Sequence, residues 1–187
     1  MSSDVFTILT VCTGNVCRSP AAERLLADKL GPTVRVASAG THALVGHPIS
    51  QPMAVLLRDG GVEPDSFEAR LVSEQMLKDA DLILPMTRAH RGVVVELWPA
   101  AVRRTFTLRE FARLLSSIDP SALPPGTPAE RLRAAIPLAI AERGRRLIPP
   151  GADDIVDPFR LSSAVYADSF AQLVSSVDLI VYAIVMR

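Results

Sequence analysis

Aromatic residues, cysteines and histidines are scarce in this 187-residue chain, and its charges cancel. Only 5% of the residues are aromatic, so a platform that stacks nucleic-acid bases is not expected. Lysine plus arginine and aspartate plus glutamate both total 20, whereas a generic nucleic-acid surface needs a basic excess. Two cysteines and three histidines, none paired at metal-ligand spacing, are too few for a multi-cysteine zinc module. Partners should therefore be recognised at a local site rather than by bulk charge.

Targeting and membrane-spanning patterns are also missing from the sequence. The N-terminal MSSDVFTIL has no basic region followed by a long apolar stretch and a small-residue cleavage site. The longest apolar run covers residues 179–186, well short of the roughly 20 residues that a membrane span needs. We expect a soluble protein of a reducing, cytoplasmic compartment.

What the chain does have is enough apolar residues (49%) to bury a core, and a length that fits one domain, residues 1–187. Apolar and β-branched runs predict strands at 5–11, 33–37, 81–86 and, more weakly, 102–107. Helical spacing fits residues 20–30 (with Ser19 as N-cap), 50–58, 73–79, 89–97, 108–118 and 162–187. This alternation predicts an α/β fold, a mostly parallel sheet covered by helices on both faces.

The composition changes between residues 119 and 150. Prolines bracket an arginine-rich apolar stretch at 129–146, which predicts an amphipathic helix that Pro137 bends or interrupts. We interpret the segment as an inserted surface helix with proline-rich connectors. A docking element for a substrate is the alternative.

The loop between the first strand and the first helix carries the chemistry; its residues are Cys12, Thr13, Gly14, Asn15, Val16, Cys17, Arg18 and Ser19. A loop at a helix N-terminus offers unpaired N–H groups and the positive end of the helix dipole, which suit a tetrahedral oxyanion. Gly14 and Asn15 tolerate left-handed backbone, and Arg18 can add a bidentate fork to phosphate oxygens. The same surroundings favour a thiolate on Cys12, to which the Ser19 hydroxyl could donate. The loop thus predicts phosphoryl transfer through a phosphocysteine.

VCTGNVCRSP, residues 11–20, resembles the signature of the low-molecular-weight protein tyrosine phosphatases. The segments SAGT (38–41), AR (69–70) with DLILPM (81–86), and DPF (157–159) extend the likeness along most of the chain. The resemblance implies a four-stranded parallel sheet in three layers, no metal or other cofactor, and hydrolysis of phosphotyrosine and other aryl phosphates in two steps.

The resemblance also implies a role for each matching residue. Cys12 would attack phosphorus while Arg18 and the loop amides hold the equatorial oxygens. Asp157 would protonate the leaving phenolate and then activate water. Asp153 and Asp154 are rival acids. Leu44 and Phe159 would contact the substrate, because many members carry an aromatic residue near position 44 and a first aromatic after the acid.

Cys17 has two interpretations that remain open at this stage. It packs beneath the loop, or it forms a reversible disulfide with Cys12, as the family and the closeness of the two thiols suggest. Three residues depart from the family pattern: Phe67 replaces a usual His, Thr87 a common Asp, and Arg160 a second aromatic. His42 and His47 are interpreted as exposed loop residues.

Leu44 makes the chain resemble bacterial members that act on tyrosine kinases of exopolysaccharide synthesis, so such a kinase is the expected partner of a monomer or weak dimer. Two other functions compete with the phosphatase. Some arsenate reductases share this loop, and one completed by a small thiol would need only one attacking cysteine. The other is a non-catalytic phosphate-binding or interaction protein.

Overall fold

Three parallel strands form the central sheet of the computed structural model, which describes residues 5–145 and 148–186. They are β1 (Phe6–Cys12), β2 (Val34–Gly40) and β3 (Leu82–Pro85), in the order β2-β1-β3. Ile8 of β1 lies opposite Val36 on one side and Leu82 on the other. β1 is the middle strand and is buried on both faces, which explains its nearly continuous apolar sequence.

The predicted fourth strand at 102–107 is wrong within the described residues. Half of that segment, residues 102–104, lies in the 3₁₀ helix η1 (Pro99–Arg104), which starts at a proline. Thr107 then caps helix α5 (Leu108–Ser117) with its side chain, in a capping box with Glu110. Only Thr105 and Phe106 remain to follow β3, by one bridge to Ile83 and one hydrogen bond of 3.1 Å from Phe106 N to Ile83 O. Helix signals on both sides therefore leave no room for a strand.

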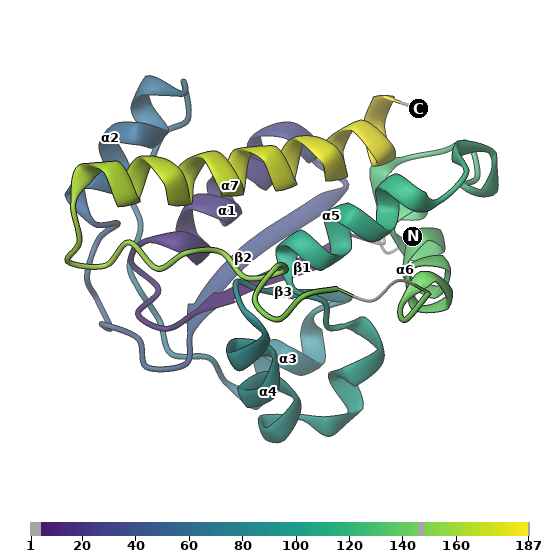
Figure 1. The fold of residues 1–187 in the computed structure, drawn as a ribbon, viewed down its shortest axis with the longest axis horizontal. Helices are drawn as coiled ribbons and strands as arrows, with labels where there is room; N and C mark the ends of the chain where they lie inside the picture. Colours follow the sequence, from purple (N-terminus) through teal and green to yellow (C-terminus); the bar gives the residue numbers. More distant parts are fainter. Residues whose placement is uncertain (1–4, 146–147, 187) are drawn as a thin grey trace.

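Helices cover both faces of the sheet, which confirms the predicted α/β architecture (Figure 1). One layer holds α1 (Arg18–Leu30), α5 and the long α7 (Ser163–Val181), with α2 (Gln51–Asp59) beside them. The other holds α3 (Glu74–Asp79), α4 (Arg88–Leu97) and η1. Helix α1 begins two residues before the predicted start, with Cys17 rather than Ser19 as N-cap, because the Ser19 side chain is turned toward Cys12 instead.

Alternate side chains of β1 point to opposite faces of the sheet and so pack into different parts of the core. Phe6 and Ile8 enter the cluster beneath α1, α5 and α7, whereas Leu9 and Val11 enter the cluster beneath α3, α4 and η1. All four side chains are at most 2% exposed. Burying a side chain of this size contributes about 1.5–3 kcal/mol, so the sheet is held firmly from both sides. That rigidity fixes where β1 ends and the loop begins.

Helix α6 (Pro128–Glu142) is the predicted helix of the proline-rich segment, and one of its faces is built into the core. Leu132, Ala135 and Ala139 are fully buried. The helix continues through Pro137, which lies on its exposed side. The buried Arg131 donates to Pro124 O at 3.0 Å and to Ala183 O at 3.1 Å, which ties α6 to its preceding connector and to the C-terminal end of the fold.

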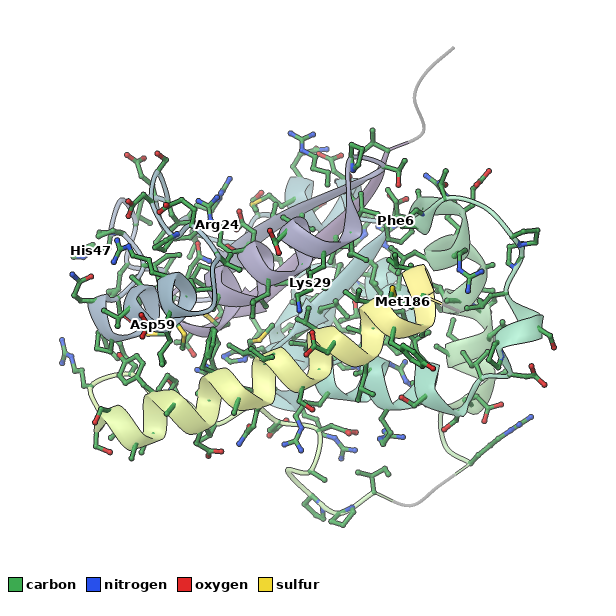
Figure 2. The ribbon with its side chains drawn as sticks, turned by 90° about the horizontal axis from the view of Figure 1, so that it is seen from above. Phe6, Arg24, Lys29, His47, Asp59 and Met186 are labelled. Atoms are coloured by element: carbon green, nitrogen blue, oxygen red, sulfur yellow. The ribbon has the colours of Figure 1, made fainter. Side chains whose placement is uncertain are left out.

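Helix α7 lies alongside α1 in Figure 2, where Lys29 of α1 points toward α7 and pairs with Asp178 at 2.5 Å. The π-helical turn η3 (Tyr182–Met186) continues α7. The stretch Ser163–Met186 is long and apolar enough to cross a membrane by length and composition alone. Leu173, Val177 and Ile180 nevertheless pack into the core. The core helix of a soluble protein can pass the same test, and 39% of this window is buried inside the fold.

Candidate active site

The loop of residues 12–19 joins the carboxyl end of β1 to the first turn of α1. Cys12 is the last residue of the strand and Arg18 is the first residue of the helix. No side chain caps the N-terminus of α1. Its first N–H groups and the positive end of its dipole therefore face the loop, an arrangement that binds anions.

Backbone hydrogen bonds hold the carbonyl groups of this loop on its outer side. The amides of residues 41, 42, 44 and 50 donate to the carbonyl oxygens of residues 12, 13, 14 and 16 respectively, at 2.7–2.9 Å. In a trans peptide the N–H of the next residue points opposite to the carbonyl. The N–H groups of residues 13, 14, 15 and 17 thus point away from the outer segment, which leaves them for an oxyanion at the loop's centre.

Asn15 locks the loop from beneath. Its backbone has a positive φ of 54°, and its side-chain Nδ2 donates to Ser19 Oγ at 3.0 Å and to Ser38 Oγ at 2.9 Å. Its Oδ1 accepts from Arg70 N at 2.8 Å. Ser38 Oγ in turn donates to the buried carboxylate of Glu23 at 2.5 Å. Asn15 is fully buried, so its role is to shape the loop from behind rather than to line the pocket.

Gly40 lets strand β2 end directly against this loop. A Cβ atom at Gly40 would lie 2.4 Å from Thr13 O and 3.0 Å from Asn15 N. Any larger residue would push the loop away from the sheet. The glycine of the SAGT segment is thus required by close approach of two backbones.

The Cys12 thiol sits at the bottom of the loop, 2% exposed, with its Sγ 3.0 Å from Ser19 Oγ. The predicted contact between these two side chains is present. Ser19 is fully buried and also contacts Ala39 O at 3.3 Å. The hydroxyl is therefore placed to hold the sulfur at a fixed position.

Arg18 and Asp157 come from distant parts of the chain and meet at this loop. Arg18 Nη2 lies 2.5 Å from Asp157 Oδ2, and Arg18 Nη1 donates to Ile155 O at 3.2 Å. Arg18 Nε is buried and has no hydrogen-bond partner within the residues described. A buried donor without a partner is costly, so the guanidinium has spare capacity for an anion.

The two rival carboxylates lie elsewhere. Asp153 is 3% exposed, and both its oxygens accept from Arg113, at 3.2 and 3.0 Å. Asp154 Oδ1 accepts from Arg88 N at 2.7 Å. The Asp157 side chain is 51% exposed, and its Oδ1 accepts from Phe159 N at 3.1 Å. Asp157 is thus the member of the trio that reaches the loop.

A pocket of about 140 Å³ opens over the Cys12 thiol. Its lining brings together most of the predicted site residues: Cys12, Thr13, Gly14, Val16, Cys17, Arg18, Leu44, Asp157 and Phe159. Leu44 and Phe159 are 38% and 39% exposed, respectively. His42, interpreted from sequence as an exposed loop residue, is exposed but also lines the pocket.

His90 is a site neighbour that the sequence did not single out. Its ring bridges two hydroxyl groups at 2.8 Å, Thr13 Oγ1 through Nε2 and Thr87 Oγ1 through Nδ1. Burial, and secondly the charge of Arg18, lower the pKa of His90 from 6.5 to about 4, so the ring is neutral at pH 7. A lone histidine on an amphipathic helix gives no sequence signal of such a contact.

Cys17 lies at the start of α1 as a free, buried thiol. Its Sγ is 3.1 Å from Ser50 Oγ and 3.6 Å from Tyr166 OH. Burial raises its pKa above the ordinary value of 9.0, which keeps Cys17 protonated at neutral pH. The two cysteines are therefore placed in different chemical surroundings.

The three departures from the family pattern each have a local role. Thr87 caps α4, accepting from His90 N at 3.2 Å. Phe67 is buried under the Arg24 guanidinium, 5.9 Å from the ring centre. Arg160, with a φ of 61°, lies 5.1 Å from the Phe159 ring centre. Across the described residues, no three His, Cys, Asp or Glu side chains are grouped to hold a metal ion.

Comparison with known proteins defines the class. Residues 7–119 match the family model described as low molecular weight phosphotyrosine protein phosphatase. The chain belongs to this family and is a phosphatase, a hydrolase that works through a cysteine nucleophile. The matched region ends before the segment that bears Asp157.

Individual relatives carry two different names. A protein-arginine-phosphatase of Geobacillus stearothermophilus is 40% identical over 70% of this chain and 86% of its own length. The low molecular weight protein-tyrosine-phosphatase Etp of Escherichia coli K12 is 38% identical over 61% of this chain and 76% of its own. The crystal structure of the tyrosine phosphatase AmsI of Erwinia amylovora has a TM-score of 0.72 at 25% identity, covering 97% of this chain and 94% of that one.

Proposed function

We propose that this phosphatase hydrolyses phosphotyrosine in proteins, with Cys12 as nucleophile, Arg18 as phosphate clamp and Asp157 as general acid. The observation that carries the proposal is the convergence of these three side chains on one small pocket, although Asp157 lies 139 residues from Arg18. The loop amides and Arg18 supply the oxyanion donors. The substrate ring would enter between the apolar walls.

In the first step the Cys12 sulfur attacks phosphorus, and the bond from phosphorus to the phenolic oxygen breaks. Asp157 gives its proton to the departing oxygen, so the product is a neutral phenol and the enzyme holds a phosphocysteine. The Ser19 hydroxyl, 3.0 Å from Sγ, holds the sulfur in line. Arg18 exchanges its contact with Asp157 for the equatorial oxygens of phosphate, which frees the acid for the leaving group.

In the second step water attacks the phosphocysteine, and the sulfur–phosphorus bond breaks. Asp157, now a carboxylate, takes the proton from that water, which restores the thiolate and the acid. The exposed position of Asp157 supports this role, because water must reach phosphorus from its side. The hydrogen bond from Phe159 N holds the carboxyl group at the rim in both steps.

The size and chemistry of the pocket support an aryl ester. Its apolar walls are Val16, Leu44 and Phe159, and a phenol ring has matching flat apolar faces. Asp157, the carboxylate that lines it, is paired with Arg18. We extend the proposal to a phosphorylated tyrosine kinase of polysaccharide synthesis as the substrate. We also propose the cytoplasm as the location, because both site cysteines are free thiols, as a reducing compartment would keep them.

A second candidate is hydrolysis of phosphoarginine, favoured by the 40% identity to a protein-arginine-phosphatase. A phosphoarginine side chain would place a cationic guanidinium beside Leu44 and Phe159, with Asp157 as its carboxylate partner. In that arrangement Asp157 would need to be a carboxylate to neutralise the cation and a carboxylic acid to donate the proton. The apolar walls therefore favour the tyrosine ester.

One competition assay separates these candidates. We expect kcat/KM for a phosphotyrosine peptide to exceed that for the matched phosphoarginine peptide by at least tenfold, and replacement Leu44→Asp to lower the ratio by giving the pocket a second carboxylate. If kcat/KM of the wild type were higher for the phosphoarginine peptide than for the phosphotyrosine peptide, phosphoarginine would be the preferred substrate. The same assay includes arsenate with a small thiol as a third substrate. Faster turnover of arsenate than of either peptide would identify a reductase.

A further inference from the structure

A second pocket is lined by residues of α4, α5, the segment after α6 and the start of the acid-bearing loop, residues 153–159. Its volume is about 670 Å³. The charged side chains that line it are Arg88, Arg91, Glu110, Arg113, Arg143 and Asp153. None of them belongs to the site described above.

The charges of this pocket do not balance. Among the described residues that line it, four guanidinium groups share two carboxylates, which leaves a formal charge of +2. Arg143 holds Glu110 at 2.8 Å and stacks on Phe106 at 4.1 Å, and Arg113 holds Asp153 at 3.0 Å. Each carboxylate is thus already engaged closely by one arginine.

Among the described residues, the carboxylates nearest to the other two arginines lie at long range. Arg91 Nη1 lies 4.0 Å from Glu110 Oε2, and Arg88 Nη2 lies 3.8 Å from Asp153 Oδ2. Burial, and then the positive charge of Arg143, lower the pKa of Arg91 below its ordinary value, with Arg88 adding to the effect and Glu110 opposing it. Crowded guanidinium groups of this kind are stabilised by an anion.

We propose that this pocket is an accessory binding site for a phosphate group. A phosphate monoester carries about −1.5 to −2 charges at pH 7, which matches the excess of the pocket. Arg88 and Arg91 stand three residues apart on α4 and so share one helix face, from which two planar forks can engage a tetrahedral oxyanion. A second phosphorylated side chain on the protein substrate and free inorganic phosphate both supply this chemistry.

The pocket is joined to the acid-bearing loop by short contacts. Asp153 O accepts from Thr107 Oγ1 at 2.8 Å, and Asp154 O accepts from Arg109 Nη1 at 3.0 Å. Arg88 contacts both of these aspartates: its side chain lies near the Asp153 carboxylate, and its backbone N–H donates to the Asp154 carboxylate. A phosphate bound at Arg88 and Arg91 therefore lies against the segment that leads to Asp157.

Calorimetry with inorganic phosphate tests the site, using the full chain after one equivalent of orthovanadate has filled its Cys12 pocket and unbound vanadate has been removed. We expect one phosphate to bind per vanadate-loaded chain, and Arg91→Gln to weaken that binding roughly tenfold or more, since it removes a charged hydrogen bond. Arg91→Lys, which keeps the charge, should lose less. The control is Arg103→Gln, which removes the same charge from an exposed position on η1 outside the pocket.

Thermal unfolding of each variant verifies that it is folded before titration. Absence of phosphate binding in the vanadate-loaded wild type, or equal loss in Arg91→Gln and Arg103→Gln, would overturn the proposal. The readout does not depend on Cys12 turnover, so its failure is separate from failure of the phosphotyrosine assignment.

Peptides distinguish the two sources of phosphate. If the second group belongs to the substrate, a doubly phosphorylated peptide has a lower KM than its singly phosphorylated form, and Arg91→Gln removes that advantage. If free phosphate is the ligand, the two peptides have equal KM while calorimetric binding persists. Either pattern supports the site and names its source.

Discussion

The phosphate-binding loop (residues 12–19) and the acid-bearing loop (residues 153–159) meet at one pocket, but they are held in different ways. The first is fixed by backbone hydrogen bonds to the 41–50 segment and by the buried Asn15. The second is held by arginine side chains from α1 and α5 and by the backbone N–H of Arg88 in α4, and its Asp157 is half exposed. The difference separates a rigid anion cradle from a proton donor that must change partners during the reaction.

This contrast assigns different consequences to substitutions in the two loops. Changes in the phosphate-binding loop should remove chemistry or deform the cradle, because its groups have no alternative positions. Changes in the acid-bearing loop should alter proton transfer while leaving anion binding intact.

The largest effect is expected for Cys12→Ser. A serine hydroxyl at this position is a far weaker nucleophile, so kcat should fall roughly 10⁴-fold or more. Steady-state hydrolysis of p-nitrophenyl phosphate measures it. Cys17→Ser is the matched control and should lose much less, because the Cys17 thiol is protonated and held by Ser50; equal losses would contradict the assignment of Cys12 as the nucleophile.

Asp157→Asn should lower kcat by about 10²–10⁴-fold with little change in the affinity for vanadate. The amide cannot supply a proton but keeps the shape of the side chain. Asp154→Asn, a neighbouring carboxylate that lines no part of the Cys12 pocket, should lose less than tenfold. If the two variants were equally impaired, the acid would have to be sought elsewhere.

Asn15→Ala should destabilise the fold by about 3 kcal/mol or more, because it leaves buried partners unsatisfied and places an alanine at positive φ. Asn15→Gly removes the same hydrogen bonds but tolerates the backbone conformation. The difference between the two variants in urea unfolding reports the backbone cost alone. Equal stability would show that the left-handed conformation is not what asparagine provides here.

His90 predicts a pH dependence of stability. Its pKa of about 4 in the folded protein lies below the ordinary 6.5, so the unfolded chain binds the proton first as the pH falls. The free energy of unfolding should therefore decrease between pH 6.5 and pH 4, by at most about 3 kcal/mol from this group. Above pH 6.5 the contribution is constant.

The measurement is urea unfolding across that pH range for the wild type and for His90→Gln, whose side chain does not titrate. Other groups titrate equally in both proteins, so the difference isolates the histidine. Parallel curves would mean that His90 is not held neutral by its surroundings.

The same contrast explains what could be predicted from sequence. The phosphate-binding loop is encoded locally, by a strand, eight loop residues and a helix start, and its composition was enough to predict the anion cradle. Asp157 was predicted through a resemblance rather than from its own surroundings. The residues that hold its loop, such as Arg113 and Arg109, come from other elements and carry no local signal.

Errors of fold prediction have a similar origin. The weak strand at 102–107 is rich in β-branched residues, but the 3₁₀ helix that starts at Pro99 takes its first half and Thr107 caps the next helix. Helix α6 was predicted from an arginine-rich apolar stretch between prolines, whereas its packing into the core depends on contacts with distant elements. The contact of His90 with the phosphate-binding loop could not be predicted from the sequence, because its partner Thr13 lies 77 residues away.

Trapping the intermediate tests the central claim most directly. Asp157→Asn should slow release of phosphate from the enzyme, so acid quenching during turnover of p-nitrophenyl phosphate should capture a phosphorylated chain. Peptide mass spectrometry is expected to find one phosphate, on Cys12. Phosphate on another residue, or none in a variant that still releases nitrophenol, would contradict a mechanism through phosphocysteine at Cys12.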